Sequence, residues 1–156
     1  MKKIISLCLA LFFSGCQEKI TTPNIELIQK AQLMHLKTVT LDTHDDINIK
    51  NFTDSINYTM DTDTQVNLPK MERGGLDVAW FIVYTGQGEL TAEGYEKAAA
   101  NAQSKFDAIH RLVTQYAPNQ IGLARSSAEA DTLRMLGKKV AMIGVENAYP
   151  LGENLH

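Results

Sequence analysis

Apolar residues gather in two long runs, 76–84 and 139–146, and each run predicts a strand buried on both faces. Polar residues stand only near the ends of these runs. Strands of a parallel sheet are covered on both faces, so they show such runs instead of alternation. A shorter β-branched run at 39–42 predicts an earlier strand, which a polar cluster at 42–46 follows.

Between these runs, apolar residues recur at steps of three and four, the spacing of one helix face. The pattern predicts helices over about 23–36 and 91–116, and another that starts at Ser126. Thr22-Pro23, Thr91 and Ser126 have the residue types that favour helix starts. Residues 48–72 are polar and poorly periodic, so we expect a long connection there.

Three strands separated by helices predict an α/β fold with a parallel sheet. In such folds the side chains at the carboxyl ends of the strands form the active site. His44 and Asp46 follow the first predicted strand, and Glu146 ends the third. No glycine-rich phosphate loop follows any of these strands, which leaves a nucleotide site without support.

Composition and charge narrow the function classes. The chain has 156 residues, which is room for one ordinary domain. Lys and Arg number 15 against 18 Asp and Glu, a net charge of −3 that argues against a nucleic-acid binder. Its two cysteines, Cys8 and Cys16, lie near the amino terminus, so the rest has no disulfide framework and no thiolate metal site.

The amino-terminal residues have the pattern of a secretory signal. Lys2 and Lys3 precede a mainly apolar stretch at 4–13, which is shorter than the ~20 residues that a membrane-spanning helix needs. The sequence Phe13-Ser14-Gly15-Cys16 then resembles the bacterial lipobox, in which the cysteine is lipidated and becomes the new amino terminus.

We therefore expect residues 1–15 to be a lipoprotein signal peptide and 16–22 to be a tether. The protein would then be exported and held in the bacterial cell envelope by lipid on Cys16. The alternative is an ordinary signal peptide in which Cys16 is incidental.

The most informative polar cluster is His44-Asp45-Asp46. In an extended segment residues i and i+2 point to the same side, so the His44 imidazole and the Asp46 carboxylate can converge on one ion. Both groups suit zinc, and Glu146 could reach the same place from another strand. A carboxylate can also bridge two metal ions about 3.5–4 Å apart. The alternatives are a solvated turn at 42–46 and a glutamate that merely ends a strand.

Other candidate residues have simpler interpretations. His35 and His110 fall on predicted helices, where we expect ordinary surface or rim positions. Trp80 lies in an apolar run and is expected in the core. His156 is the last residue of the chain and carries no inference.

Three blocks resemble the membrane (renal-type) dipeptidase family of zinc hydrolases, and in particular its bacterial secreted members. The blocks are Thr-Leu-Asp-Thr-His-Asp-Asp at 40–46, the stretch 68–81 that begins Leu-Pro-Lys, and the stretch 141–152 that begins Ala-Met-Ile-Gly-Val-Glu. Their order and spacing are also similar to the family, and the resemblance covers about residues 36–155.

This resemblance implies a (β/α)8 barrel of the metal-dependent hydrolase type with two zinc ions per complete active site. His44 and Asp46 would match the His-x-Asp pair that binds one zinc, and Glu146 would match the glutamate that bridges both. In the family a bridging water attacks the scissile carbonyl of a dipeptide. We expect a dipeptide substrate, no nucleic-acid partner and a membrane contact through Cys16, with a homodimer left open.

A barrel of this type needs roughly 250 residues. We therefore expect 23–156 to be the amino-terminal part of the barrel domain, with about three βα units and no activity alone. The family's other zinc and substrate ligands fall outside the part that is matched. Two alternatives remain open: a related metal hydrolase such as a lactonase or phosphodiesterase, and a truncated lipoprotein without catalysis.

Overall fold

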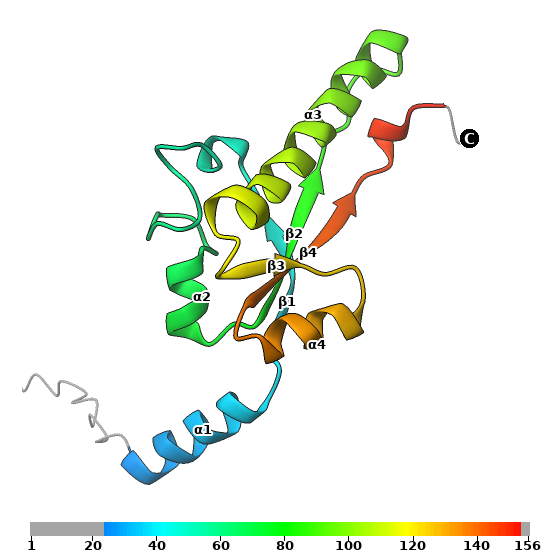
Figure 1. Cartoon of the computed structure of the whole chain (residues 1–156). Coiled ribbons are helices and arrows are strands. Elements are labelled where there is room, and N and C mark those ends of the chain that lie inside the picture. The colour runs from blue at the N-terminus through cyan, green and yellow to red at the C-terminus, as the bar shows by residue number, and fades with distance from the viewer. Residues whose placement is uncertain (1–23, 154–156) are drawn as a thin grey trace, which may run out of the picture.

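A parallel sheet of four strands organises the chain in the computed structural model, which describes residues 24–153 (Figure 1). The strands lie in the order β1-β2-β4-β3, and all neighbours are parallel. Their bounds are β1 Leu41–Asp46, β2 Val78–Tyr84, β3 Ile121–Leu123 and β4 Lys139–Glu146. The predicted α/β class with a parallel sheet is confirmed.

Within residues 24–153, four α-helices and three short turns of helix precede, connect or follow the strands. The α-helices are α1 Ile25–Lys37, α2 Leu68–Gly74, α3 Ala92–Arg111 and α4 Ser127–Met135. The short turns are η1 Ile49–Asn51, η2 Leu112–Tyr116 and η3 Tyr149–Leu151. α3 lies along the sheet beside β2, and α4 lies beside β3 and β4 (Figure 1).

The first strand differs from its prediction in both bounds. It was expected at 39–42, but β1 runs over Leu41–Asp46 because Asp45 and Asp46 pair with Phe81 and Ile82 of β2. Backbone pairing therefore extends the strand through residues whose side chains gave no strand signal. His44 and Asp46 consequently lie within a strand and not in a turn after it.

The prediction of three strands misses β3. This strand has only three residues, and its middle residue is Gly122, so it has neither the length nor the side chains of a recognisable pattern. It pairs with the first residues of β4, at Lys139–Ala141.

The connection expected at 48–72 contains more structure than its composition suggests. Its last part forms α2, whose amino end is capped by Asn67, with the Oδ1 atom accepting from the Lys70 N–H at 3.0 Å. The amide of Asn67 is fully buried and donates to Thr62 and Thr64, which fixes the preceding loop.

The helix starts agree in part with their predictions. Thr91 and Ser126 cap α3 and α4 as predicted. α1 is capped by Asn24, whose Oδ1 accepts from the Leu27 N–H at 3.2 Å, whereas the predicted cap, Thr22, lies outside the described residues. α3 ends at Arg111, and a π-helical turn continues it to Tyr116.

Side chains of β2 alternate between two separate hydrophobic clusters, one on each face of the sheet. Ala79, Phe81 and Val83 belong to the larger cluster, which α3 completes with residues such as Ile109. Val78 belongs to the smaller cluster on the opposite face, and Trp80 packs against that cluster as the sequence predicts. The smaller cluster lies towards the amino ends of the strands, so it leaves the carboxyl end of its face free for polar side chains.

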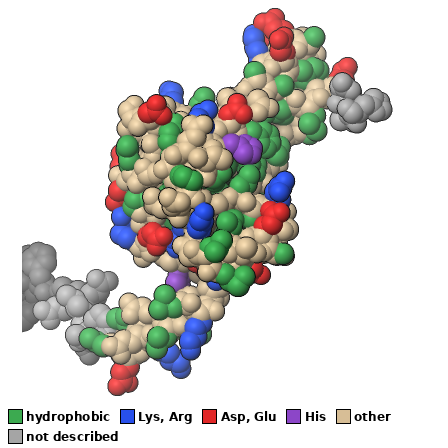
Figure 2. Space-filling model, in the orientation of Figure 1, with side chains coloured by type: hydrophobic (Ala, Val, Ile, Leu, Met, Phe, Trp, Pro, Cys, Tyr) green, Lys and Arg blue, Asp and Glu red, His purple; other side chains and the backbone are tan. Residues whose placement is uncertain are grey.

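α1 lies apart from the sheet, and none of its residues is buried (Figures 1 and 2). In the part of the chain that the structure describes, the large apolar side chains of α1 are exposed to solvent. His35 is more than a surface residue, because its Nε2 atom lies 3.1 Å from the Gly74 carbonyl oxygen and 3.2 Å from that of Gly75. Over residues 24–153, no helix combines the length and the apolar character needed to span a bilayer.

Replacing Gly75 by alanine should destabilise the protein. Gly75 ends α2 with φ +65°, and an added Cβ would overlap the His35 ring. We expect a loss of about 1–2 kcal/mol in the free energy of unfolding, measured by urea denaturation, since L-residues are strained at this φ. Gly74→Ala is the matched control, because nothing lies within 4 Å of its Cβ position. Equal effects of the two substitutions would contradict this account.

Candidate metal centre

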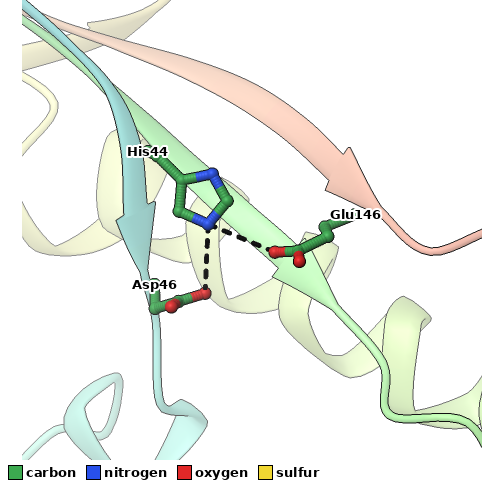
Figure 3. A group of neighbouring side chains, drawn as sticks. All are labelled: His44, Asp46 and Glu146. Atoms are coloured by element: carbon green, nitrogen blue, oxygen red, sulfur yellow. Dashed lines mark ion pairs between the residues drawn. The ribbon is translucent and has the colours of Figure 1, made fainter.

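β1 and β4 bring His44, Asp46 and Glu146 together at the carboxyl end of the sheet (Figure 3). β2 lies between these strands and sets their relative height. Asp46 is in register with Ile82 and Ile82 with Gly144, while Glu146 is in register with Tyr84. Adjacent strands are about 4.8 Å apart, so long side chains are needed to meet across β2.

Gly144 shapes the surface between the donors. It is the β4 residue in register with Ile82, and a Cβ added to it would lie 2.6 Å from the Ile82 Cδ1 atom. The missing side chain therefore lets Ile82 extend towards β4, where it is almost completely buried. The sequence signal was a glycine inside a strand, which often marks a close approach, but we did not single it out.

The donor atoms of the three side chains are close to one another. The His44 Nε2 atom lies 3.1 Å from Glu146 Oε2 and 3.9 Å from Asp46 Oδ1. One donor atom from each residue can be chosen so that all lie within 4.8 Å of one another. The side chains are 53%, 69% and 49% exposed for His44, Asp46 and Glu146, so a solute can reach them.

This donor set fits a zinc ion. Bonds of 2.0–2.2 Å in a tetrahedral site place neighbouring donors about 3.4 Å apart, and the two His44 distances lie on either side of that value. One imidazole nitrogen with carboxylate oxygens is a set that zinc accepts. The structure thus assembles the three residues that the sequence selected, and their role as ligands stays a prediction.

Asp45 points away from these donors. It is in register with Phe81, is only 6% exposed, and lies against the larger hydrophobic cluster. Burial, together with the nearby charge of Asp42, raises the pKa of the Asp45 carboxyl from 3.8 to about 6. No described group hydrogen-bonds to its buried Oδ2 atom. The pKa of Tyr58 rises to about 12, through its burial and the charge of Asp45.

The remaining candidates are not part of the cluster. His110 is on α3, where its Nδ1 atom lies 2.8 Å from the Phe106 carbonyl oxygen, so its interpretation as an ordinary helical residue is supported. Cys16 and His156 lie outside the described residues. No metal-ligand cluster other than His44, Asp46 and Glu146 occurs within residues 24–153.

Comparisons with known proteins point to one family. The sequence profile of the membrane dipeptidase family, peptidase family M19, matches residues 28–156. The probable dipeptidase PvdM from Pseudomonas aeruginosa is similar in structure, with 25% identity, a TM-score of 0.75 and 83% of this chain covered. The dipeptidase AC, a metallopeptidase of family M19, has 17% identity, a TM-score of 0.55 and 72% of this chain covered, and it supports the fold alone.

The chain spans about a third of the length of these solved structures, since 33% of the first and 36% of the second are covered. Both structures have the (β/α)8-barrel fold, so the parallel sheet corresponds to part of such a barrel. The search of curated proteins gave no match.

The buried carboxyl of Asp45 should make stability depend on pH. A pKa of about 6 in the folded state, against 3.8 as its ordinary value, means that the folded state holds this proton more tightly. Stability should therefore fall as pH rises through this range. We expect Asp45→Asn to remove about 2 kcal/mol of this fall.

The measurement is urea denaturation at pH 4 to 7.5 with a chelator present, so that no metal ion alters the carboxyl. Asp54→Asn, at an exposed position, is the control. A stability difference between the wild type and Asp45→Asn that stays constant with pH would disprove the assignment.

Proposed function

The chain belongs to the membrane dipeptidase family, peptidase family M19, and from this membership we propose that its activity is zinc-dependent hydrolysis of dipeptides. The observation that supports the proposal is the convergence of His44, Asp46 and Glu146 from two strands at the carboxyl end of a parallel sheet. Active sites of α/β barrels lie at that end of the strands.

Each of the three residues has a distinct part in the proposal. His44 and Asp46 would hold one zinc ion through an imidazole nitrogen and a carboxylate oxygen. Glu146 has two oxygens and would bridge that ion and a second one. Zinc bound there would supply Lewis-acid chemistry, polarising the scissile carbonyl and lowering the pKa of a water molecule so that it can attack.

The protein residues also determine how the water and the substrate reach the site. The three side chains are about half exposed or more, so a small peptide can approach them directly. Asp45 keeps its charge on the opposite face of the sheet, where it cannot compete for the ion. The carboxylates of Asp46 and Glu146 partly balance the charge of the metal ions, which favours cations over anions at this end of the sheet.

The alternative explanation is an exposed ion pair between a protonated His44 and the two carboxylates. Such pairs contribute little to stability and need no metal. Metal content therefore distinguishes the two interpretations. A dipeptide panel, assayed with chelator and after zinc is restored, then tests the activity itself.

His44→Ala and Glu146→Gln in the full-length protein should both lower zinc content and dipeptide turnover. Loss of a direct ligand should exceed the roughly 10- to 100-fold loss of affinity that removal of an outer partner causes. Glu146→Gln keeps the size of the side chain but removes its charge and one acceptor oxygen, so a bridging role predicts that the second metal is lost. Zinc content is measured by elemental analysis after equilibrium dialysis.

His110→Ala is the matched control, because it removes a histidine from α3 without touching the cluster. Its zinc content and turnover should equal those of the wild type. Undiminished zinc in His44→Ala, or two bound metals with normal turnover in Glu146→Gln, would refute the assignment.

We also propose that lipid on Cys16 anchors the protein to the bacterial cell envelope, on the strength of the lipobox-like sequence. Cys16→Ser should then move the protein from the membrane fraction to the soluble fraction, because two or more acyl chains are needed for stable anchoring. Cys8→Ser is the control and should leave the distribution unchanged. A mature amino terminus with unmodified Cys16, seen by mass spectrometry, would rule out the anchor.

A further inference from the structure

β1 contains one residue more than β2 at the level of His44. Leu41 and Asp42 are in register with Val78 and Ala79, whereas Asp45 and Asp46 are in register with Phe81 and Ile82. Between these pairs, Thr43 and His44 both lie opposite the single residue Trp80. This two-against-one arrangement is a β-bulge.

The bulge decides which face of the sheet the donors occupy. Residues in register on neighbouring parallel strands point to the same face, so Asp42 shares the face of Ala79. Without the extra residue, the period of two would put His44 and Asp46 on that face as well, under the larger hydrophobic cluster. Because of the bulge, Asp45 takes the buried position opposite Phe81. Asp46 then points to the other face of the sheet, which carries the smaller hydrophobic cluster and which we call the open face.

The Asp42 side chain accepts a hydrogen bond within the bulge. A bulge disrupts the backbone hydrogen bonds of the strand at that point. Here the His44 N–H donates to the Asp42 Oδ1 atom at 3.0 Å. Asp42 is the last regularly paired residue before the bulge, and a carboxylate bonded to the amide two residues later is a local turn typical of Asp and Asn.

We propose that Asp42 is a positioning residue for the metal centre: its side-chain bond to the His44 amide holds the bulge that turns His44 and Asp46 to the open face. This inference rests on the proposed function only where metal affinity is concerned. The hydrogen-bonding role differs from a role of charge, because the Asp42 carboxylate also adds negative potential near the donors. Asparagine separates the two, since it keeps the Oδ1 acceptor and loses the charge.

The test compares Asp42→Ala, Asp42→Asn and the control Thr43→Ala in the full-length protein. In the metal-free protein, hydrogen exchange of the His44 amide, followed by NMR, should be about five- to tenfold faster in Asp42→Ala and unchanged in the other two. Zinc affinity should fall about tenfold in Asp42→Ala, the lower end of the effect of an outer partner, and should be retained in Asp42→Asn.

Two results would overturn the inference. One is an unchanged His44 exchange rate in Asp42→Ala, and the other is an equal loss of affinity in Asp42→Asn, which would assign the effect to charge. Should Asp42→Ala fail to fold, hydrogen exchange in the unmodified protein still tests the inference. A His44 amide that exchanges there as fast as in an unfolded chain would exclude the hydrogen bond to Asp42. Zinc retained by His44→Ala would refute the proposed metal centre and not the role of Asp42. The hydrogen-exchange measurement would still test whether Asp42 holds the bulge.

Discussion

Parallel pairing of β2 with a strand on each side is the constraint on which the rest of the structure depends. It sets β1 and β4 at fixed heights relative to each other, although these two strands do not pair with each other.

 Glu146 follows Asp46 by 100 positions in the sequence, yet the two side chains lie in one cluster at the carboxyl end of the sheet. Because both outer strands are held to the same central strand, donors from distant parts of the sequence meet without a loop that reaches between them.

The two faces of the sheet give their side chains different environments. One face is closed by α3 and the larger hydrophobic cluster, and it takes the side chain of Asp45. The other face is apolar near the amino ends of the strands and polar near their carboxyl ends. Neighbouring residues of one short segment, Asp45 and Asp46, therefore experience opposite environments, which explains why burial perturbs the pKa of Asp45.

The sequence was sufficient for the features that depend on side-chain pattern. The apolar runs located β2 and β4, and the order of polar residues at strand ends selected His44, Asp46 and Glu146. The features that it missed depend on backbone pairing. β3 has three residues and a central glycine, and β1 continues through charged residues because β2 offers it hydrogen-bonding partners. The alternation of side chains at positions i and i+2 also could not predict the bulge at His44, because only the register with β2 reveals the extra residue.

The short length of β3 has a consequence for Glu146. β3 supports β4 only at Lys139–Ala141, so within the described residues the carboxyl half of β4 is hydrogen-bonded along one side, to β2. A strand that is paired on one side opens more readily than a central one. An ion shared by β1 and β4 would act as a cross-link over β2, and part of its binding energy would be used to order this half-supported strand. With such an ion bound, metal affinity and the local rigidity of this part of the sheet would be coupled quantities.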